Sequence, residues 1–194
     1  MTKYIHGIEF SFKFPYIALL CTVLVLDKNG GIFACFFASF LHEIGHLIAL
    51  AVLRQKVRRV EFSVFDIKIV APYPITLCKR LIVVLSGVAM NFILVIFFFA
   101  IIPLFGYANL FIGLFNILPV STLDGGQALE LILVRLIGKQ KTTLTLNILT
   151  VATAVPIFTF GIIVLLNTGY NFSFLALGIY LLLTVIYKKD TLEV

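Results

Sequence analysis

The sequence predicts an all-α polytopic membrane protein with about six transmembrane helices. Composition, the length of the apolar runs and the distribution of basic residues lead to this fold class. Hydrophobic residues make up 61% of the 194-residue chain and charged residues 12%, against about 45–50% and about 25% in soluble domains. The mean hydropathy is +1.14. Neither a repeat nor a low-complexity tract divides the chain, so we expect one integral-membrane domain over residues 1–194.

Six apolar segments are the candidate spans, since a spanning helix needs about 20 apolar residues. They are residues 12–26, 31–53, 81–104, 107–137, 144–166 and 172–187. The first is short. The fourth is broken by Pro119 and by Asp124-Gly125-Gly126, and Pro156 in the fifth predicts a kink.

One long polar connection, residues 54–80, separates the second and third apolar segments. Within it, residues 60–64 and 65–69 alternate apolar and polar side chains with a period of about two. This alternation predicts short strands at the membrane surface.

The basic residues indicate the topology. With six spans, 14 of the 15 Lys and Arg residues lie on the side that carries both termini, and Lys28 alone lies on the other. Basic loops stay in the cytoplasm, so we expect a multi-pass protein of a bacterial cell membrane with both termini cytoplasmic. The net charge of +6 is then a topology signal with some attraction to the lipid bilayer, and nucleic acid is not an expected partner.

The second apolar segment contains His42-Glu43-Ile44-Gly45-His46. Two imidazoles four residues apart share one face of a helix and can hold one metal ion, and Glu43 can act as general base on water. Gly45 leaves room for a neighbouring helix. The alternative is a pair of buried histidines hydrogen-bonded to the backbone or to another helix.

A catalytic zinc ion takes three protein ligands and keeps a fourth position open. His6 lies outside the spans and is expected at the surface. Asp124 is the better third ligand, because irregular backbone at membrane depth is tolerated where it is buried or lines a wet cavity. The alternative is that Asp124 only caps the helix that follows it.

Two asparagines, Asn91 and Asn116, lie in the third and fourth apolar segments. Each is a candidate to bind substrate or to stabilise an oxyanion, and the alternative for each is an interhelical hydrogen bond. Glu130 is six residues beyond Asp124, faces elsewhere and is taken as structural.

Three motifs in order, each in its own apolar segment, resemble the site-2 protease family of intramembrane zinc metalloproteases. They are His42-Glu43-x-x-His46, then Ser86-Gly87 with Asn91, then Asn116-x-x-Pro119 followed by Leu123-Asp124-Gly125-Gly126. The family often has a proline where this chain has Val88. The motifs span a three-helix catalytic core of about residues 31–138. The chain shows no PDZ or CBS sequence, and in this it is most similar to the branch that contains the bacterial sporulation protease SpoIVFB.

The resemblance implies one zinc ion bound by His42, His46 and Asp124, with Glu43 activating water. It implies membrane-embedded protein substrates, such as anti-sigma factors, pro-sigma factors or signal-peptide remnants, and a regulatory membrane protein as a further partner. Two other functions are weighed against intramembrane proteolysis: a catalytically silent zinc-binding adaptor of the same fold, and a metal or proton transporter. Transporters often have paired broken helices, and one such break is convincing here.

Overall fold

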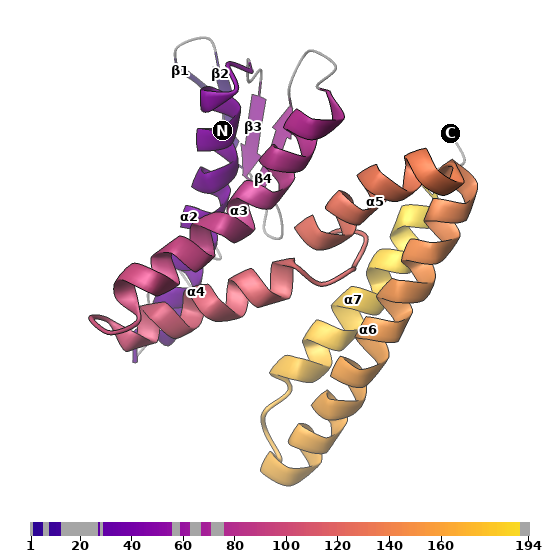
Figure 1. Cartoon of the computed structure of the whole chain (residues 1–194). Helices are drawn as coiled ribbons and strands as arrows, with labels where there is room; N and C mark the ends of the chain where they lie inside the picture. Colours follow the sequence, from indigo (N-terminus) through magenta and orange to yellow (C-terminus); the bar gives the residue numbers. More distant parts are fainter. Residues whose placement is uncertain are drawn as a thin grey trace. The chain divides into compact units, whose positions relative to one another are not determined.

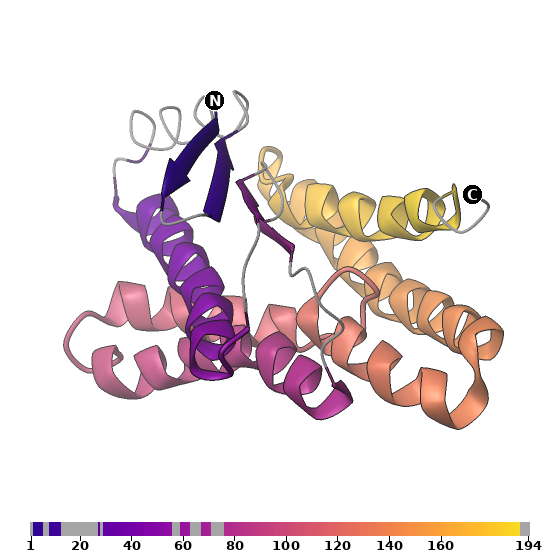
Figure 2. The ribbon, with the colours of Figure 1, turned by 90° about the horizontal axis from the view of Figure 1, so that it is seen from above.

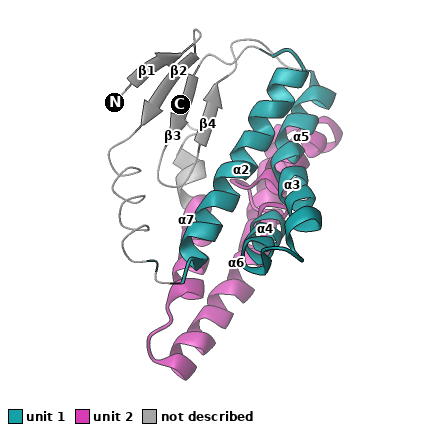
Figure 3. Cartoon of the chain, turned by 90° about the vertical axis from the view of Figure 1, so that its left-hand side faces the viewer, with its two compact units in different colours: residues 1–114 teal, residues 115–194 magenta. Residues whose placement is uncertain are grey.

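The computed structural model describes residues 2–5, 8–12, 27, 29–55, 59–62, 67–70 and 76–190. It divides into two compact units, Met1–Leu114 and Phe115–Val194, shown in teal and magenta in Figure 3. The predicted first span, residues 12–26, lies outside the described residues except for Phe12.

Helices α2 (Gly31–Val52) and α3 (Leu77–Phe98) form the helical centre of the first unit and pack side by side (Figure 1). They confirm the second and third predicted segments. Helix α3 ends sooner than expected, and α4 (Pro103–Asn116) begins with a proline. A proline suits the first helical position, because its missing N–H would find no intrahelical acceptor there.

The start of α2 is held by Asp27. Its carboxylate accepts a hydrogen bond of 2.6 Å from the backbone N–H of Phe33, one of the first-turn donors that lack an intrahelical acceptor. This bond lowers the pKa of the Asp27 carboxyl. Gly30, just before the helix, takes a left-handed conformation with φ 73°, which glycine adopts without steric cost.

A four-stranded sheet also belongs to the first unit. It consists of β1 (Thr2–Ile5), β2 (Ile8–Phe12), β3 (Arg59–Phe62) and β4 (Ile67–Val70), paired in that order. The outer pairs are antiparallel and β2 pairs with β3 in parallel (Figure 2). The strands predicted within residues 60–69 are confirmed. The strands β1 and β2 were not predicted, and Phe12 ends β2 rather than starting a helix.

The second unit consists mainly of α5 (Asp124–Ile137), α6 (Lys139–Thr168) and α7 (Ser173–Asp190). The predicted break in the fourth segment is confirmed, since residues 117–123 are not helical. Helix α6 continues through Pro156, and α6 and α7 lie side by side (Figure 1). Val120 and Leu123 of the non-helical segment pack with Ala154 of α6 and Leu181 of α7 in a buried cluster.

Three described helices, α2, α3 and α6, are long and apolar enough to cross a membrane, and α7 contains a shorter apolar stretch, Ser173–Val185. Many of their large apolar side chains are exposed, including Ile96 and Leu166. A surface of this kind needs lipid around it. The helical membrane fold is thus confirmed, and the count of six spans stays a prediction.

The contact between α6 and α7 yields a stability prediction. A Cβ atom at Gly178 would lie 2.6 Å from Cα of Phe158, so we expect Gly178→Val to separate the helices. Overpacking of this kind costs about 1–3 kcal/mol, which lowers Tm by several degrees in a chain of this size. Ala176→Val, at an exposed position of the same helix, is the matched control. Thermal unfolding in detergent measures both, and equal Tm values would contradict the packing.

Candidate metal centre

Helix α2 buries one stripe of side chains that contains both motif histidines. His42 is 3% exposed and His46 is 8% exposed. The stripe continues through the small residues Ala34, Ala38, Gly45 and Ala49, which recur at helical spacing. Glu43 is half-buried, so the helix buries the two imidazoles more deeply than the carboxylate between them.

Glycines bring α3 close to these histidines. A Cβ atom at Gly45 would lie 2.7 Å from the backbone oxygen of Ser86 and 2.8 Å from Cβ of Met90. The expected role of Gly45 in close helix packing is confirmed. A Cβ atom at Gly87 would lie 2.5 Å from Nε2 of His46 and 2.7 Å from Nε2 of His42. The Ser86-Gly87 motif therefore keeps the space beside both imidazoles open.

The Nδ1 atoms of both histidines are engaged by α3. Nδ1 of His46 lies 2.7 Å from the backbone oxygen of Val83, which can only accept, so Nδ1–H of His46 is the donor. The Ser86 hydroxyl donates to the same oxygen at 2.6 Å. Nδ1 of His42 lies 2.6 Å from Oδ1 of Asn91. Partners of this kind fix the ring orientation and tautomer of metal-binding histidines.

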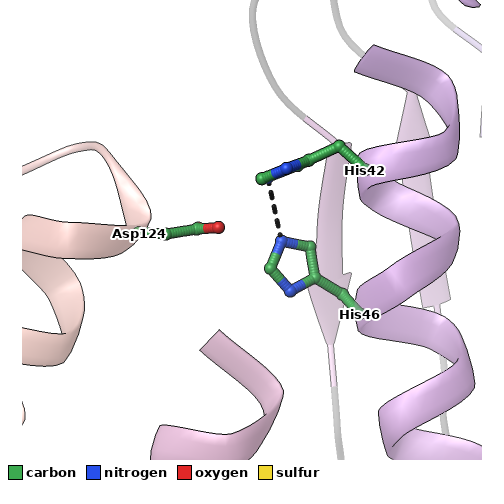
Figure 4. A group of neighbouring side chains, drawn as sticks. All are labelled: His42, His46 and Asp124. Carbon is green, nitrogen blue, oxygen red and sulfur yellow. Dashed lines mark hydrogen bonds between the residues drawn. The ribbon is translucent and has the colours of Figure 1, made fainter. Parts of the chain in front are cut away.

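The Nε2 atoms face one another at 3.3 Å (Figure 4). With both protons on Nδ1, each Nε2 directs a lone pair toward the same region, where one cation can accept both. Two nitrogens, each about 2.05 Å from one ion at a tetrahedral angle, would lie about 3.3 Å apart. The spacing of the imidazoles therefore fits a shared tetrahedral cation such as zinc.

Asp124 is held by the second unit. It is 8% exposed and is the first residue of α5, after Leu123 in the N-cap position. A Cβ atom at Gly125 or Gly126 would overlap the backbone carbonyl groups of Ile117 or Val120. The two glycines therefore allow the first turn of α5 to pack on the preceding segment, and they fix where Asp124 begins the helix.

Helix α6 anchors the same segment. The backbone N–H of Ser121 donates to the hydroxyl of Thr150 at 3.2 Å, and that hydroxyl donates to the backbone oxygen of Leu146 at 2.7 Å. Thr150 is fully buried. The role of Thr150 was not predicted from the sequence, although a threonine within an apolar helix is a usable signal.

The donor set matches a metal site. His42, His46 and Asp124 are each buried, and Figure 4 shows the two histidine side chains on α2 and that of Asp124 on α5. Two imidazole nitrogens and one carboxylate oxygen are ligands that catalytic zinc takes in proteins. Asp124 belongs to the second unit, whereas both histidines belong to the first.

The two predicted asparagines differ in what the structure shows. Asn91 is fully buried on α3, and its interhelical hydrogen bonds to α2 are those expected under the alternative interpretation. Asn116 is half-buried at the last position of α4. Substrate binding by either residue stays a prediction, as does the structural role of Glu130.

Asn109 of α4 was missed. It is fully buried, and its Oδ1 accepts a hydrogen bond of 2.9 Å from Nδ2 of Asn91. A third amide within the apolar run was visible in the sequence. Its pairing with Asn91 depends on the packing of α4 against α3, which the sequence does not display.

The chain is similar to the solved structure of the site-2 protease from Methanocaldococcus jannaschii, with a TM-score of 0.69 over 96% of this chain and 94% of that chain. The fold resembles that of a site-2 protease. At 18% sequence identity the likeness concerns the fold alone, and the branch without PDZ or CBS domains stays a prediction. No protein-family model and no curated protein sequence matches the chain.

Gly87 provides a test of the histidine pair. Gly87→Ala would place a methyl group against both Nε2 atoms, so we expect metal binding to fall at least tenfold while the helices stay folded. Gly31→Ala is the matched control, since a Cβ atom there meets nothing within 4 Å. Metal content and affinity of the purified proteins give the measurement. Wild-type affinity in Gly87→Ala would show that the metal lies elsewhere.

Proposed function

We propose that the chain is an intramembrane zinc metalloendopeptidase that cuts membrane-associated protein substrates. The observation that carries the proposal is the pair of buried imidazoles in α2, whose Nε2 atoms lie 3.3 Å apart while both Nδ1 atoms are engaged by α3. Two buried Nε2 atoms at this spacing are suited to hold one zinc ion between them. A site-2 protease fold supports the same function.

Asp124 is proposed as the third ligand, so that His42, His46 and Asp124 hold one zinc ion and leave a fourth position open for water or substrate. Its burial at the start of α5 supports this assignment, because a carboxylate at membrane depth needs a compensating cation. The fold similarity covers 96% of the chain and therefore includes residues of both units.

Glu43 is proposed as the general base. A bound zinc ion supplies a Lewis acid that acidifies a water ligand and polarises the scissile carbonyl. Glu43 takes a proton from the attacking water and returns it to the leaving amine. Glu43 follows His42 directly, so its side chain lies about 100° around the helix axis from that imidazole. From there the carboxylate would reach the water without being a metal ligand.

The substrate must unwind before it is cut, because the carbonyl groups of a membrane helix are held in hydrogen bonds. The four-stranded sheet offers backbone for strand addition at β4, which pairs with β3 alone among the described strands. Anti-sigma factors, pro-sigma factors and signal-peptide remnants are the substrate classes proposed. Asn91 and Asn116 are kept as proposed substrate-binding residues, with Asn91 also acting on His42.

Removal of the general base is the direct test of function. We expect Glu43→Gln to lower the cleavage rate at least a thousandfold while zinc stays bound, since the ligands are unchanged. Glu130→Gln is the matched control and should keep wild-type cleavage. The measurement combines cleavage of membrane-protein substrates by the purified enzyme with proteomics of cells that express each variant.

Two results would overturn the proteolytic role. A Glu43→Gln protein that keeps its cellular effect and leaves no substrate uncut would indicate the zinc-binding adaptor. Metal or proton flux into vesicles that contain the wild-type chain, without cleavage, would indicate the transporter.

The third ligand has its own test. We expect Asp124→Asn to weaken zinc binding at least tenfold, because a neutral amide replaces a charged ligand. Asp27→Asn is the matched control, since an amide oxygen can still accept the hydrogen bond from Phe33. Zinc affinity is measured by chelator competition. Unchanged affinity in Asp124→Asn would point to another third ligand, with His6 the next candidate to replace.

A further inference from the structure

A chain of buried amides links α4 to His42. The side-chain Nδ2 of Asn109 donates to the backbone oxygen of Phe105 at 2.8 Å. Oδ1 of Asn109 accepts from Nδ2 of Asn91 at 2.9 Å, and Oδ1 of Asn91 lies 2.6 Å from Nδ1 of His42. Both asparagines are fully buried, so water does not compete for these bonds.

The packing of α4 on α3 fixes this chain in place. A Cβ atom at Gly113 would lie 3.3 Å from Cβ of Asn91, so the helices approach closely beside the amide. Gly106, Asn109 and Gly113 are among the buried residues of α4, spaced by three and four positions. They form one face of the helix, which presents the amide of Asn109 between two glycines.

The direction of every hydrogen bond in the chain is set by backbone oxygens. The oxygen of Phe105 can only accept, so it selects Nδ2 of Asn109 and leaves Oδ1 of Asn109 to face Asn91. Oδ1 of Asn109 can also only accept, so the atom of Asn91 that faces it must be Nδ2. The backbone oxygen of Ala38 accepts a second, longer bond of 3.3 Å from the same nitrogen. Oδ1 of Asn91 therefore faces His42.

An asparagine amide can otherwise take either of two orientations. If Asn91 were turned over, its Nδ2 would donate to Nδ1 of His42, and the imidazole proton would move to Nε2. An Nε2–H cannot bind a metal. The orientation of one amide thus decides whether His42 offers its lone pair toward His46 or away from it.

We propose that Asn109 is a positioning residue that holds His42 in the Nδ1–H tautomer, through Asn91, and so prepares Nε2 for the metal. Asn109 acts on the imidazole through Asn91 rather than by a hydrogen bond of its own. The proposal rests on the proposed function in taking His42 as a zinc ligand, and the tautomer itself is a property of the metal-free protein. Partners of this outer kind typically contribute 10–100-fold to metal affinity.

The experiment measures the tautomer directly. Metal-free protein labelled with ¹⁵N-histidine is studied by NMR at mildly alkaline pH. The chain has three histidines, so single His→Gln variants assign the signals. The proteins are the wild type, Asn109→Leu, Asn109→Ala and Asn91→Leu, with Asn167→Leu, at an exposed position of α6, as the matched control.

We expect Nδ1–H at both His42 and His46 in the wild type and in Asn167→Leu. In Asn109→Leu and Asn109→Ala, a share of His42 should shift to Nε2–H while His46, bound to the backbone oxygen of Val83, keeps its signal. Asn91→Leu should shift His42 at least as far. Zinc affinity, measured by chelator competition, should fall about tenfold in the Asn109 variants.

An unchanged His42 tautomer in either folded Asn109 variant would overturn the proposal. So would an equal shift at His46, or loss of its native signal in both variants, because Asn109 would then serve folding in general. A wild-type protein that binds no zinc would instead refute the proposed function. The two failures are distinguishable, since the tautomer is read without metal.

Discussion

Every polar group that an apolar helix buries needs a hydrogen-bond partner inside the protein, because lipid offers none. Helix α2 buries two imidazoles, and α3 supplies oxygens for their Nδ1 atoms, from Val83 and Asn91. Once those bonds are made, each ring has one remaining polar atom. These two Nε2 atoms lie 3.3 Å apart, a spacing that suits a shared cation.

Small residues make this arrangement possible. Gly45 and Gly87 bring the α2 and α3 backbones together, and only at that distance can the backbone of α3 reach an imidazole of α2. Gly113 has the same effect for α4 beside Asn91. In the second unit, Gly125 and Gly126 pack the start of α5 on its preceding segment. At each of these places, a glycine lets the neighbouring segment pack more closely than a larger side chain would allow.

Local patterns in the sequence predicted most of the fold. The apolar runs predicted α2, α3, α6 and α7, although the ends of these helices differ from those expected. Pro119 and Gly125-Gly126 predicted the break between α4 and α5. The alternation of Ile8, Phe10 and Phe12 with polar residues was also present, but β2 pairs in parallel with β3 across about 50 intervening residues. Such a pairing leaves no local signature, so the sheet was predicted only in part.

The sequence by itself determined which residues are candidates for the site. The i, i+4 histidines, the glutamate between them and the aspartate at the helix break follow from spacing and from the cost of charge in lipid. Only the tertiary structure decided which nitrogen of each ring is available for metal, and that Asn109 takes part. The partners are 49, 37 and 18 residues apart along the chain. The tautomer of each imidazole depends on which oxygen faces its Nδ1 atom. The packing of the helices against one another places that oxygen, and the formation of each helix alone does not.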